Sequence, residues 1–311
     1  MATAAEILNK IVENVGEVIV GKQETVELAL CALLCGGHVL IEDIPGVGKT
    51  SLVYAFAKSF NSSFKRIQFT PDILPSDVTG FSMYNHKNGE FEYRPGSIMA
   101  NIVLADEINR TSPKTQSSLL EAMEEHQVTV DGTTYKVPKP FAVFATQNPA
   151  DHIGTYPLPE AQLDRFFIRI SLGYPTFEEE LGMVGRFNGA SPLETLKPVV
   201  SASTLLALQE LAAKVHVSLE MMAYMVAIVR QTRNHPDIDL GCSPRGSLAL
   251  YKAAQAWALY KGRAYVIPDD ALKMAVPVLA HRLGLTQEAR FKKVDPMKLM
   301  GHVASLVKIP K

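Results

Sequence analysis

The chain has 311 residues, of which 47% are apolar, and its 31 Lys and Arg against 32 Asp and Glu give a formal net charge of −1. This composition is typical of a globular protein with one large domain or two smaller ones. Balanced charge without a basic run argues against a dedicated nucleic-acid binder, and no apolar run approaches the roughly 20 residues that cross a bilayer. The N-terminal stretch lacks the basic and apolar regions of a secretory signal, so we expect a cytoplasmic protein without membrane insertion.

The first 60 residues predict two helices, a strand, a loop and a third helix. Apolar residues recur at helical spacing in two segments of residues 6–36, with Val20 and Gly21 between them. Residues 38–42 form a short apolar run next to glycines, which is typical of a buried strand. A loop follows, and helical spacing resumes from 49 to 60.

Strands continue to alternate with helices up to residue 171. Ser112 followed by Pro113 is typical of the N-cap and first turn of a helix, which we expect to run through Met123. Alternation of this kind favours a parallel sheet with helices on both faces, so the sequence predicts an α/β domain. The further strands are expected at residues 64–70, 101–105, 141–146 and 166–171.

Two hairpins are expected as inserts in this α/β core. Residues 81–97 contain Asn88-Gly89, and residues 128–137 contain Asp131-Gly132. Both dipeptides favour tight hairpin turns because their residues accept positive φ.

The strand signals stop after residue 175. Thr176 with Glu179 three residues later is a capping box, which indicates a helix start. Apolar stripes at helical spacing follow in every later segment. We therefore predict an α/β domain over residues 1–175 and an all-helical domain over residues 176–311.

The three cysteines and eight histidines predict neither a disulfide framework nor a zinc site. Cys31 and Cys35 lie in an apolar stretch and Cys242 stands alone, without a Cys-x-x-Cys pair. An odd cysteine count also argues against paired disulfides. The histidines are scattered and form no His-Glu-x-x-His motif, so no zinc ligand set is expected.

Gly48-Lys49-Thr50 closes a glycine-containing loop between a predicted strand and a predicted helix. Gly46 and Gly48 free the backbone to curl, so its N–H groups and the helix N-terminus can cradle phosphates. Lys49 would reach the β- and γ-phosphates, and the Thr50 hydroxyl would hold Mg²⁺. Residue 43 is Asp where the full phosphate-loop pattern has glycine. Aspartate at this position either weakens phosphate binding or shows that this corner of the loop needs no positive φ. The alternative interpretation of the whole loop is a tight turn that binds no phosphate.

Polar side chains also follow two later strands. Asp106 and Glu107 come directly after the strand at 101–105, at the sheet edge where the phosphate loop is expected. Asp106 can bind Mg²⁺ through water, and Glu107 can polarise an attacking water. Asn148 follows the fourth strand and could orient that water, although an Asn before Pro is more often a turn residue. Together these residues predict ATP hydrolysis with Mg²⁺.

The order and spacing of these motifs resemble the AAA+ ATPases and, among them, the MoxR family. The resemblance covers nearly the whole chain, and it makes Asp43 look like a family feature rather than a defect. The matching stretches are residues 41–50, 104–110, 114–116 with 120–124, 146–149 and 158–166.

The resemblance implies roles for single residues. Val20 and Gly21 match the stretch that packs on adenine, and Arg110 is a second candidate for an arginine that acts between subunits. The two hairpins are similar to the helix-2 insert and the pre-sensor-1 hairpin. By this resemblance, Walker A consists of Gly46, Gly48, Lys49 and Thr50, and the neighbouring Pro45, Val47 and Ser51 also bind the nucleotide. Walker B consists of Asp106 and Glu107, and Asn148 corresponds to sensor 1. Arg165 corresponds to the arginine finger and Arg245 to sensor 2.

The family consists of chaperone-like ATPases that act with von Willebrand factor A-domain partners. The resemblance therefore implies a hexameric homo-oligomer that hydrolyses ATP and remodels or assembles partner proteins, with nucleotide bound between the two domains and between subunits. A DNA-acting AAA+ motor is one alternative, which the neutral charge disfavours. A nucleotide-gated scaffold with little turnover is another, against which Glu107 and Asn148 argue.

Overall fold

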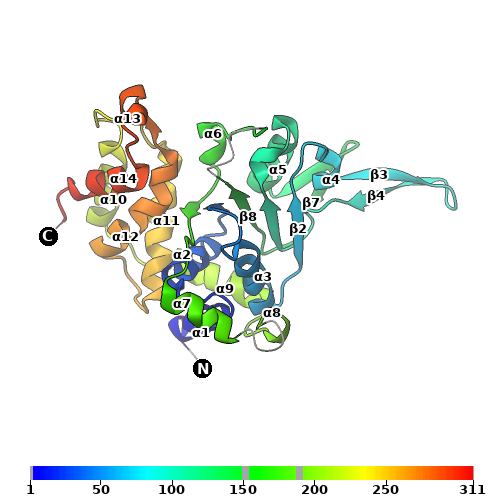
Figure 1. Ribbon diagram of the computed structural model, residues 1–311, viewed down its shortest axis with the longest axis horizontal. Coiled ribbons are helices and arrows are strands. Elements are labelled where there is room, and N and C mark those ends of the chain that lie inside the picture. Colours follow the sequence, from blue (N-terminus) through cyan, green and yellow to red (C-terminus); the bar gives the residue numbers. More distant parts are fainter. Residues whose placement is uncertain (1–2, 149–153, 187–191, 311) are drawn as a thin grey trace.

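The computed structural model describes residues 3–148, 154–186 and 192–310, and its centre is a five-stranded parallel sheet (Figure 1). The strand order is β2-β5-β8-β1-β9. All five predicted strands are present, and the predicted α/β fold is confirmed. The strands are β1 (Val39–Glu42), β2 (Phe64–Gln68), β5 (Ile102–Asp106), β8 (Ala142–Gln147) and β9 (Ile168–Ile170).

Helices cover both faces of the sheet, so its strands contribute to two apolar cores. Val39 and Ile41 of β1 face one core, and Leu40 between them faces the other. Phe144 and Val143 of β8 divide in the same way. Side chains buried on both faces explain why these strands appear in the sequence as continuous apolar runs. The first core is covered by α1 (Ala4–Gly16), α2 (Gln23–Leu34) and α3 (Lys49–Ser59), and the second by α4 (Pro75–Thr79) and α5 (Pro113–Glu125).

Local capping sets the helix starts that the sequence indicated. The Ser112 side chain accepts a hydrogen bond from the backbone N–H of Thr115 at the start of α5. At the start of α7 (Phe177–Arg186), the Thr176 N–H donates to the Glu179 carboxylate over 2.8 Å, and the Glu179 N–H donates back to Thr176 Oγ1 over 3.3 Å. Both predicted caps are therefore present.

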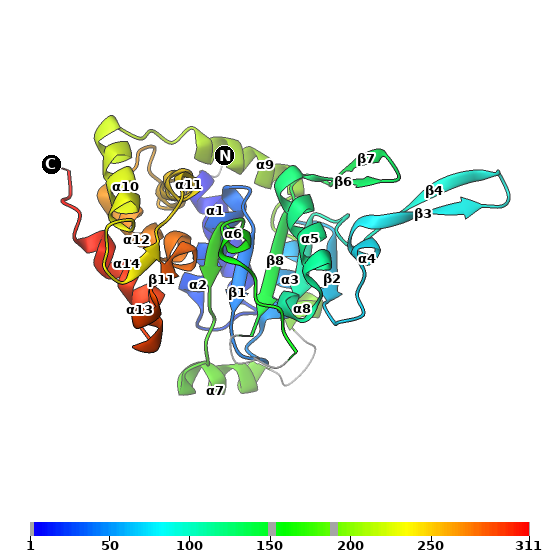
Figure 2. The same cartoon turned by 90° about the horizontal axis from the view of Figure 1, so that it is seen from above.

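The two predicted hairpins project from the same side of the molecule (Figure 2). One consists of β3 (Gly80–Asn85) and β4 (Glu90–Pro95), and the other of β6 (Gln127–Val130) and β7 (Thr133–Lys136). Asp131 and Gly132 both have positive φ, as a two-residue hairpin turn requires. The rings of Tyr93 and Tyr135 stack with their centroids 3.8 Å apart and join the bases of the hairpins.

The region after residue 175 is mainly helical, with one correction to the prediction. Two short strands, β10 (Ile238–Leu240) and β11 (Gly284–Leu285), form an antiparallel ladder within it. Strands of two and three residues are too short to produce a period in the sequence. The α-helices in this region after α7 are α8 (Pro192–Thr195), α9 (Ala202–Ala213), α10 (Leu219–Gln231), α11 (Pro244–Tyr260), α12 (Pro268–Leu279), α13 (Gln287–Phe291) and α14 (Pro296–Ser305).

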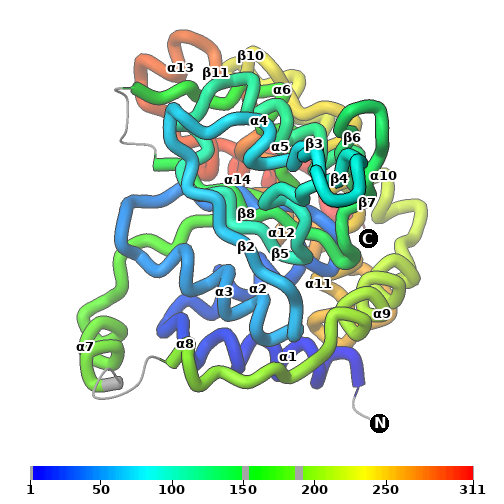
Figure 3. The backbone as a smooth tube through the Cα atoms, turned by 90° about the vertical axis from the view of Figure 1, so that its right-hand side faces the viewer, coloured from blue at the N-terminus to red at the C-terminus, as the bar shows by residue number. Residues whose placement is uncertain are grey.

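Helix α11 joins the C-terminal helices to the rest of the molecule, because it contacts α1, α2, α9, α10 and α12. The first apolar core is continuous across this contact. Figure 3 shows α7 standing apart from the other helices after residue 175. The division at residue 175 lies between β9 and α7, and it stays a proposal. Within the described ranges, no helix has both the length and the apolar character needed to span a membrane.

Candidate functional site

The loops after β1, β5 and β8 meet at the carboxyl edge of the sheet around a cavity of about 350 Å³. Parallel strands all end at this edge, so side chains far apart in the sequence come together there. Pro149, the last residue of the 146–149 stretch that resembles the MoxR family, lies outside the residues that the structure describes. The cavity is lined by Pro45, Gly46, Gly48, Lys49, Thr50, Ser51, Arg66, Gln68, Asp106, Glu107, Thr146 and Asn148.

The loop between β1 and α3 turns at two glycines whose backbone lies in the left-handed region. Gly46 has φ +85° and Gly48 has φ +93°, and α3 begins immediately afterwards at Lys49. A Cβ at Gly46 would meet no atom within 4 Å, so the backbone angle alone favours glycine there. The Lys49 amine donates to the carbonyls of Asp43 and Ile44 over 2.7 and 3.0 Å. Asp43 itself is not among the residues with positive φ, so that corner does not require glycine.

Asp106 is fixed at the end of β5 by two neighbouring strands. Its Oδ1 accepts from the Thr146 hydroxyl of β8 over 2.6 Å, and its Oδ2 pairs with the Arg66 guanidinium of β2 over 2.6 Å. The Thr146 hydroxyl also accepts from the N–H of Glu107 over 2.9 Å. One buried hydroxyl therefore positions both acidic residues.

Glu107 has φ +56°, a left-handed conformation that is unfavourable for a residue with a side chain. Its Oε2 accepts hydrogen bonds from Gln68 Nε2 and Arg110 Nη1, each over 2.9 Å. The carboxylate is partly exposed at the cavity that also holds Lys49. Arg110, the second inter-subunit candidate, thus pairs with the acidic residue of its own subunit.

Thr146→Val is expected to lower both stability and ATP turnover. Valine keeps the shape but leaves Asp106 Oδ1 and the Glu107 N–H without their hydroxyl partner. An unsatisfied buried group costs about 1–3 kcal/mol, which denaturant unfolding would measure. Thr129→Val, at an exposed threonine pair of the β6–β7 hairpin, is the matched control with little expected effect. A Thr146→Val protein with wild-type unfolding and wild-type turnover would contradict this role.

A second cavity of about 340 Å³ adjoins the phosphate-loop cavity and is mainly apolar. Such a pocket suits the flat adenine ring of a nucleotide, since apolar walls with few polar groups bind aromatic rings well. Val20 lies in its wall, and its contact with adenine stays a prediction. The full lining is Val18, Ile19, Val20, Lys22, Pro45, Gly46, Val47, Gly48, Ser51, Gly173, Tyr174, Pro175, Glu180, Met183, Pro192 and Leu193.

Gly21 lies next to Val20 and Lys22 of this cavity, and it leaves room for the Glu179 side chain of α7. It has φ +75°, and a Cβ there would lie 2.0 Å from a carboxylate oxygen of Glu179. The neighbouring Lys22 amine donates to the Tyr174 carbonyl over 2.9 Å and pairs with Glu179 over 3.2 Å. The 20–22 segment is thus tied to the start of α7.

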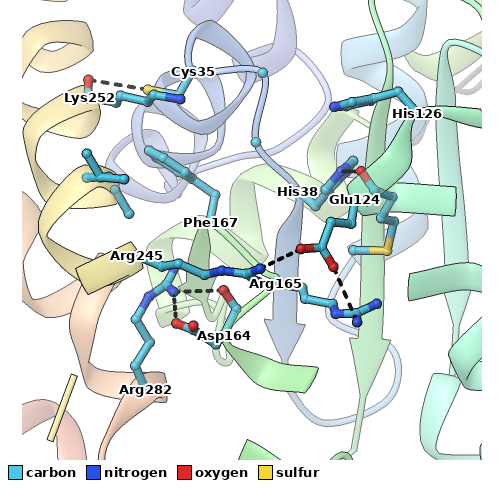
Figure 4. A pocket seen from close by; sticks show the side chains of 15 residues that line it. Cys35, His38, Glu124, His126, Asp164, Arg165, Phe167, Arg245, Lys252 and Arg282 are labelled. Carbon is cyan, nitrogen blue, oxygen red and sulfur yellow. Dashed lines mark hydrogen bonds and ion pairs between the residues drawn. The ribbon is translucent and has the colours of Figure 1, made fainter. Parts of the chain in front are cut away.

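Arg165 and Arg245 lie together elsewhere, in a cavity of about 270 Å³ between α5, α11 and the start of β9 (Figure 4). Both pair with Glu124 at the end of α5, over 3.3 Å from Arg165 and 2.6 Å from Arg245. The Arg282 guanidinium donates to the Asp164 carbonyl over 2.7 Å and to the Phe166 carbonyl over 2.7 Å, which fixes the turn that carries Arg165.

This arginine cavity lies at the amino edge of the sheet, because it is lined by residues that directly precede β1 and β9. The four residues of β1 separate it from the phosphate loop by about 13 Å of strand. His38, on the same edge, accepts the Val143 N–H at Nδ1 over 3.0 Å, and its Nε2 lies 3.0 Å from the Met123 carbonyl. Burial lowers the pKa of His38 to about 4, so the cavity wall is neutral there at neutral pH.

Arg245 therefore does not line either cavity at the phosphate loop of its own subunit. Helix α11 packs against α2, α9 and α12, and this packing directs its N-terminus toward Glu124. The sensor 2 role of Arg245 therefore stays a prediction, and the structure places this arginine beside Glu124 rather than at the phosphate loop.

The sequence interpretation missed several residues that build the site. Gln68 and Thr146 lie at the carboxyl ends of β2 and β8, the position that singled out Asp106. Applying that positional rule to every strand would have found them. Arg66, Lys22 and Arg282 act through contacts distant in sequence, and no local pattern marks them.

Two family models match the chain. The ATPase family associated with various cellular activities (AAA) matches residues 38–168, and an AAA lid domain matches residues 230–300. The first match contains the phosphate loop, the two carboxylates and Arg165, and the second contains Arg245.

Relatives match almost all of the chain. Chaperone MoxR1 of Mycobacterium tuberculosis is 42% identical, over 100% of this chain and 84% of that protein. The uncharacterized protein YeaC of Bacillus subtilis is 56% identical, over 98% of this chain and 95% of its own. Protein MoxR of Paracoccus denitrificans is 30% identical, over 86% of each. The crystal structure of a protein from Cytophaga hutchinsonii, assigned as an ATPase, has a TM-score of 0.90 at 37% identity and covers 99% of this chain and 96% of that one.

Proposed function

Since this chain belongs to the MoxR family of AAA+ ATPases, we propose that it hydrolyses ATP within a hexameric ring and uses the resulting motion to remodel or assemble partner proteins. One observation carries the proposal. The phosphate-loop cavity and the arginine cavity lie at opposite edges of one sheet, so a head-to-tail arrangement of subunits can bring one against the other. In a closed ring, every phosphate-loop cavity would face the arginine cavity of a neighbouring subunit.

Within one subunit, the carboxyl-edge residues divide the chemical work. The loop amides and the Lys49 amine bind the phosphates, exchanging the carbonyl contacts of Asp43 and Ile44 for phosphate oxygens. Thr50 and Asp106 supply the hydroxyl and carboxylate oxygens that Mg²⁺ prefers, so the donor set fits that ion. Bound Mg²⁺ would neutralise phosphate charge. Glu107 accepts a proton from the attacking water, and Asn148 orients that water.

Arg165 and Arg245 then act on the nucleotide of the neighbouring subunit. Both guanidinium groups pair with the Glu124 carboxylate in this structure. A γ-phosphate carries more negative charge than one carboxylate and would bind the same two groups more strongly. Because Arg165 lies just before β9 in the α/β domain and Arg245 lies in the first turn of α11 in the C-terminal helical region, one phosphate contacted by both would link these two regions. We assign the arginine finger and sensor 2 roles on this basis.

The hairpins provide the surface for a partner, which we propose to be a von Willebrand factor A-domain protein in the cytoplasm. The β3–β4 hairpin extends furthest from the sheet (Figure 2). Its outer part exposes Tyr84 and Phe91, whose rings contact each other with centroids 5.3 Å apart. An exposed aromatic pair on a projecting hairpin is typical of a protein-binding surface.

Replacing residues 84–91 with Asn-Gly is expected to spare folding and basal ATP turnover but to abolish partner capture. The removed Tyr84 and Phe91 side chains are 44% and 74% exposed, and the Tyr93–Tyr135 stack at the base is kept. The measurement is a pull-down with ATP-loaded Glu107→Gln protein as bait, with and without the hairpin tip. Lys87→Ser, an exposed change in the turn, is the control. A lower unfolding temperature with undiminished capture would show instead that the tip has a structural role.

A further inference from the structure

Asp43, which replaces a glycine of the usual phosphate-loop pattern, makes contacts that no glycine could make. Its Oδ2 accepts from the Ser171 hydroxyl over 3.0 Å, from the Leu172 N–H over 2.5 Å and from the Gly173 N–H over 2.8 Å. Its Oδ1 accepts from the Ile44 N–H over 3.0 Å. The residue is only 6% exposed, so these contacts are shielded from water. The carboxylate is held by four donors from two separate segments.

The segment that Asp43 holds continues directly into the wall of the apolar cavity. Gly173, Tyr174 and Pro175 line this cavity, and the Lys22 amine donates a hydrogen bond to the Tyr174 carbonyl of the same segment. Asp43 does not line either cavity at the loop, and its carboxylate oxygens accept from Ile44 and from residues 171–173. The side chain can therefore position the apolar wall from outside both cavities.

We propose that Asp43 is a positioning residue that holds the Ser171–Gly173 segment against the phosphate loop and so shapes the pocket for the base of ATP. The inference rests on the proposed nucleotide site and adds a specific role to it. Glycine at position 43 would leave the Leu172 N–H, which is buried, without an acceptor. Residues 173–175 would then move away from the adenine base of ATP, while Gly46, Gly48 and Lys49 would still bind its phosphates.

Asp43→Gly restores the usual phosphate-loop pattern and yet is expected to weaken ATP binding by about tenfold or more. Inorganic tripolyphosphate has no base, so its Kd is expected to change little. The ratio of the two Kd values, measured by calorimetry, therefore isolates the base-dependent part of binding. In steady-state hydrolysis, KM for ATP should rise by a similar factor while kcat stays near the wild-type value.

Two further variants separate this role from a loss of stability. Asp43→Asn keeps the volume and one acceptor oxygen, and it should give an intermediate change in the same ratio even if the glycine variant does not fold. Asp270→Asn is the matched control, because Asp270 is a buried carboxylate that also accepts a backbone N–H, from Ile267 over 2.8 Å, but lies in α12. It should lower the unfolding temperature without changing the ratio.

The proposal is overturned if folded Asp43→Gly or Asp43→Asn binds ATP as tightly as the wild type. It is also overturned if ATP and tripolyphosphate weaken by the same factor, since Asp43 would then act on the phosphate loop itself. The oligomeric state and partner capture of the wild type test the proposed ring function separately, and neither enters this comparison.

Discussion

Glu107→Gln is expected to bind ATP with near wild-type affinity and to lose about 10²–10⁴-fold in turnover. An amide cannot accept the proton of the attacking water, whereas the carboxylate at this position can. The phosphate contacts come from Lys49 and the loop after β1, which the substitution does not touch. The Gln68 amide and the Arg110 guanidinium that hold the carboxylate also remain, and the new amide oxygen can accept from either.

The measurement combines ATP hydrolysis under saturating nucleotide with the Kd for ATP. Glu121→Gln removes an exposed carboxylate from α5 and is the matched control, for which both quantities should stay unchanged. Hydrolysis by Glu107→Gln at the wild-type rate would mean that another group activates the water. Loss of ATP affinity would mean that Glu107 serves binding rather than the chemical step.

Much of the sheet and of its carboxyl edge could be predicted because the responsible signals are local. A strand buried on both faces needs consecutive apolar residues, so β1, β5 and β8 are legible in the sequence. Parallel strands align their carboxyl ends, which brings Asp106, Glu107 and Asn148 to the loop that holds Lys49. Turn chemistry at Asp131-Gly132 predicted a hairpin for the same reason, since those backbone angles suit few other dipeptides.

The rest depends on packing between distant segments. The amphipathic pattern of α11 shows which face is buried but not which helices cover it, so the contact of Arg245 with Glu124 could not be foreseen. Asp43 could be recognised as a departure from the loop pattern, but its partners lie about 130 positions later in the chain. Short strands such as β10 and β11 form only because tertiary contacts bring them together.

Arg165→Ala is expected to bind ATP and to hydrolyse it about 10³–10⁵-fold more slowly, because an arginine supplied in trans stabilises charge on the transferred phosphoryl group. Arg165 lies at the amino edge of the sheet, and the phosphate loop of its own subunit lies at the carboxyl edge. The turn that carries it is held by Arg282, so the side chain cannot cross the sheet without breaking those contacts. We therefore propose the nucleotide of a neighbouring subunit as the target of Arg165.

Mixing Arg165→Ala with Glu107→Gln should restore part of the activity, although each protein is nearly inactive alone. An Arg165→Ala subunit keeps an intact hydrolytic site, and a Glu107→Gln neighbour still supplies the arginine. At equal amounts and random assembly, about one interface in four combines the intact site with the intact arginine. The measurement is ATP turnover of each protein alone and of the mixture under conditions that allow subunit exchange.

The double variant Arg165→Ala with Glu107→Gln decides whether recovery comes from the arginine. Mixed with Arg165→Ala, it forms the same assemblies but offers no arginine at any interface, so turnover should stay at the level of Arg165→Ala alone. Equal recovery with the single and the double variant would show that mixing merely stabilises the ring. No recovery despite demonstrated exchange would exclude the trans role of Arg165. Arg110 would then be the next arginine to test, although its 2.9 Å contact with Glu107 places it at the acidic edge of its own subunit.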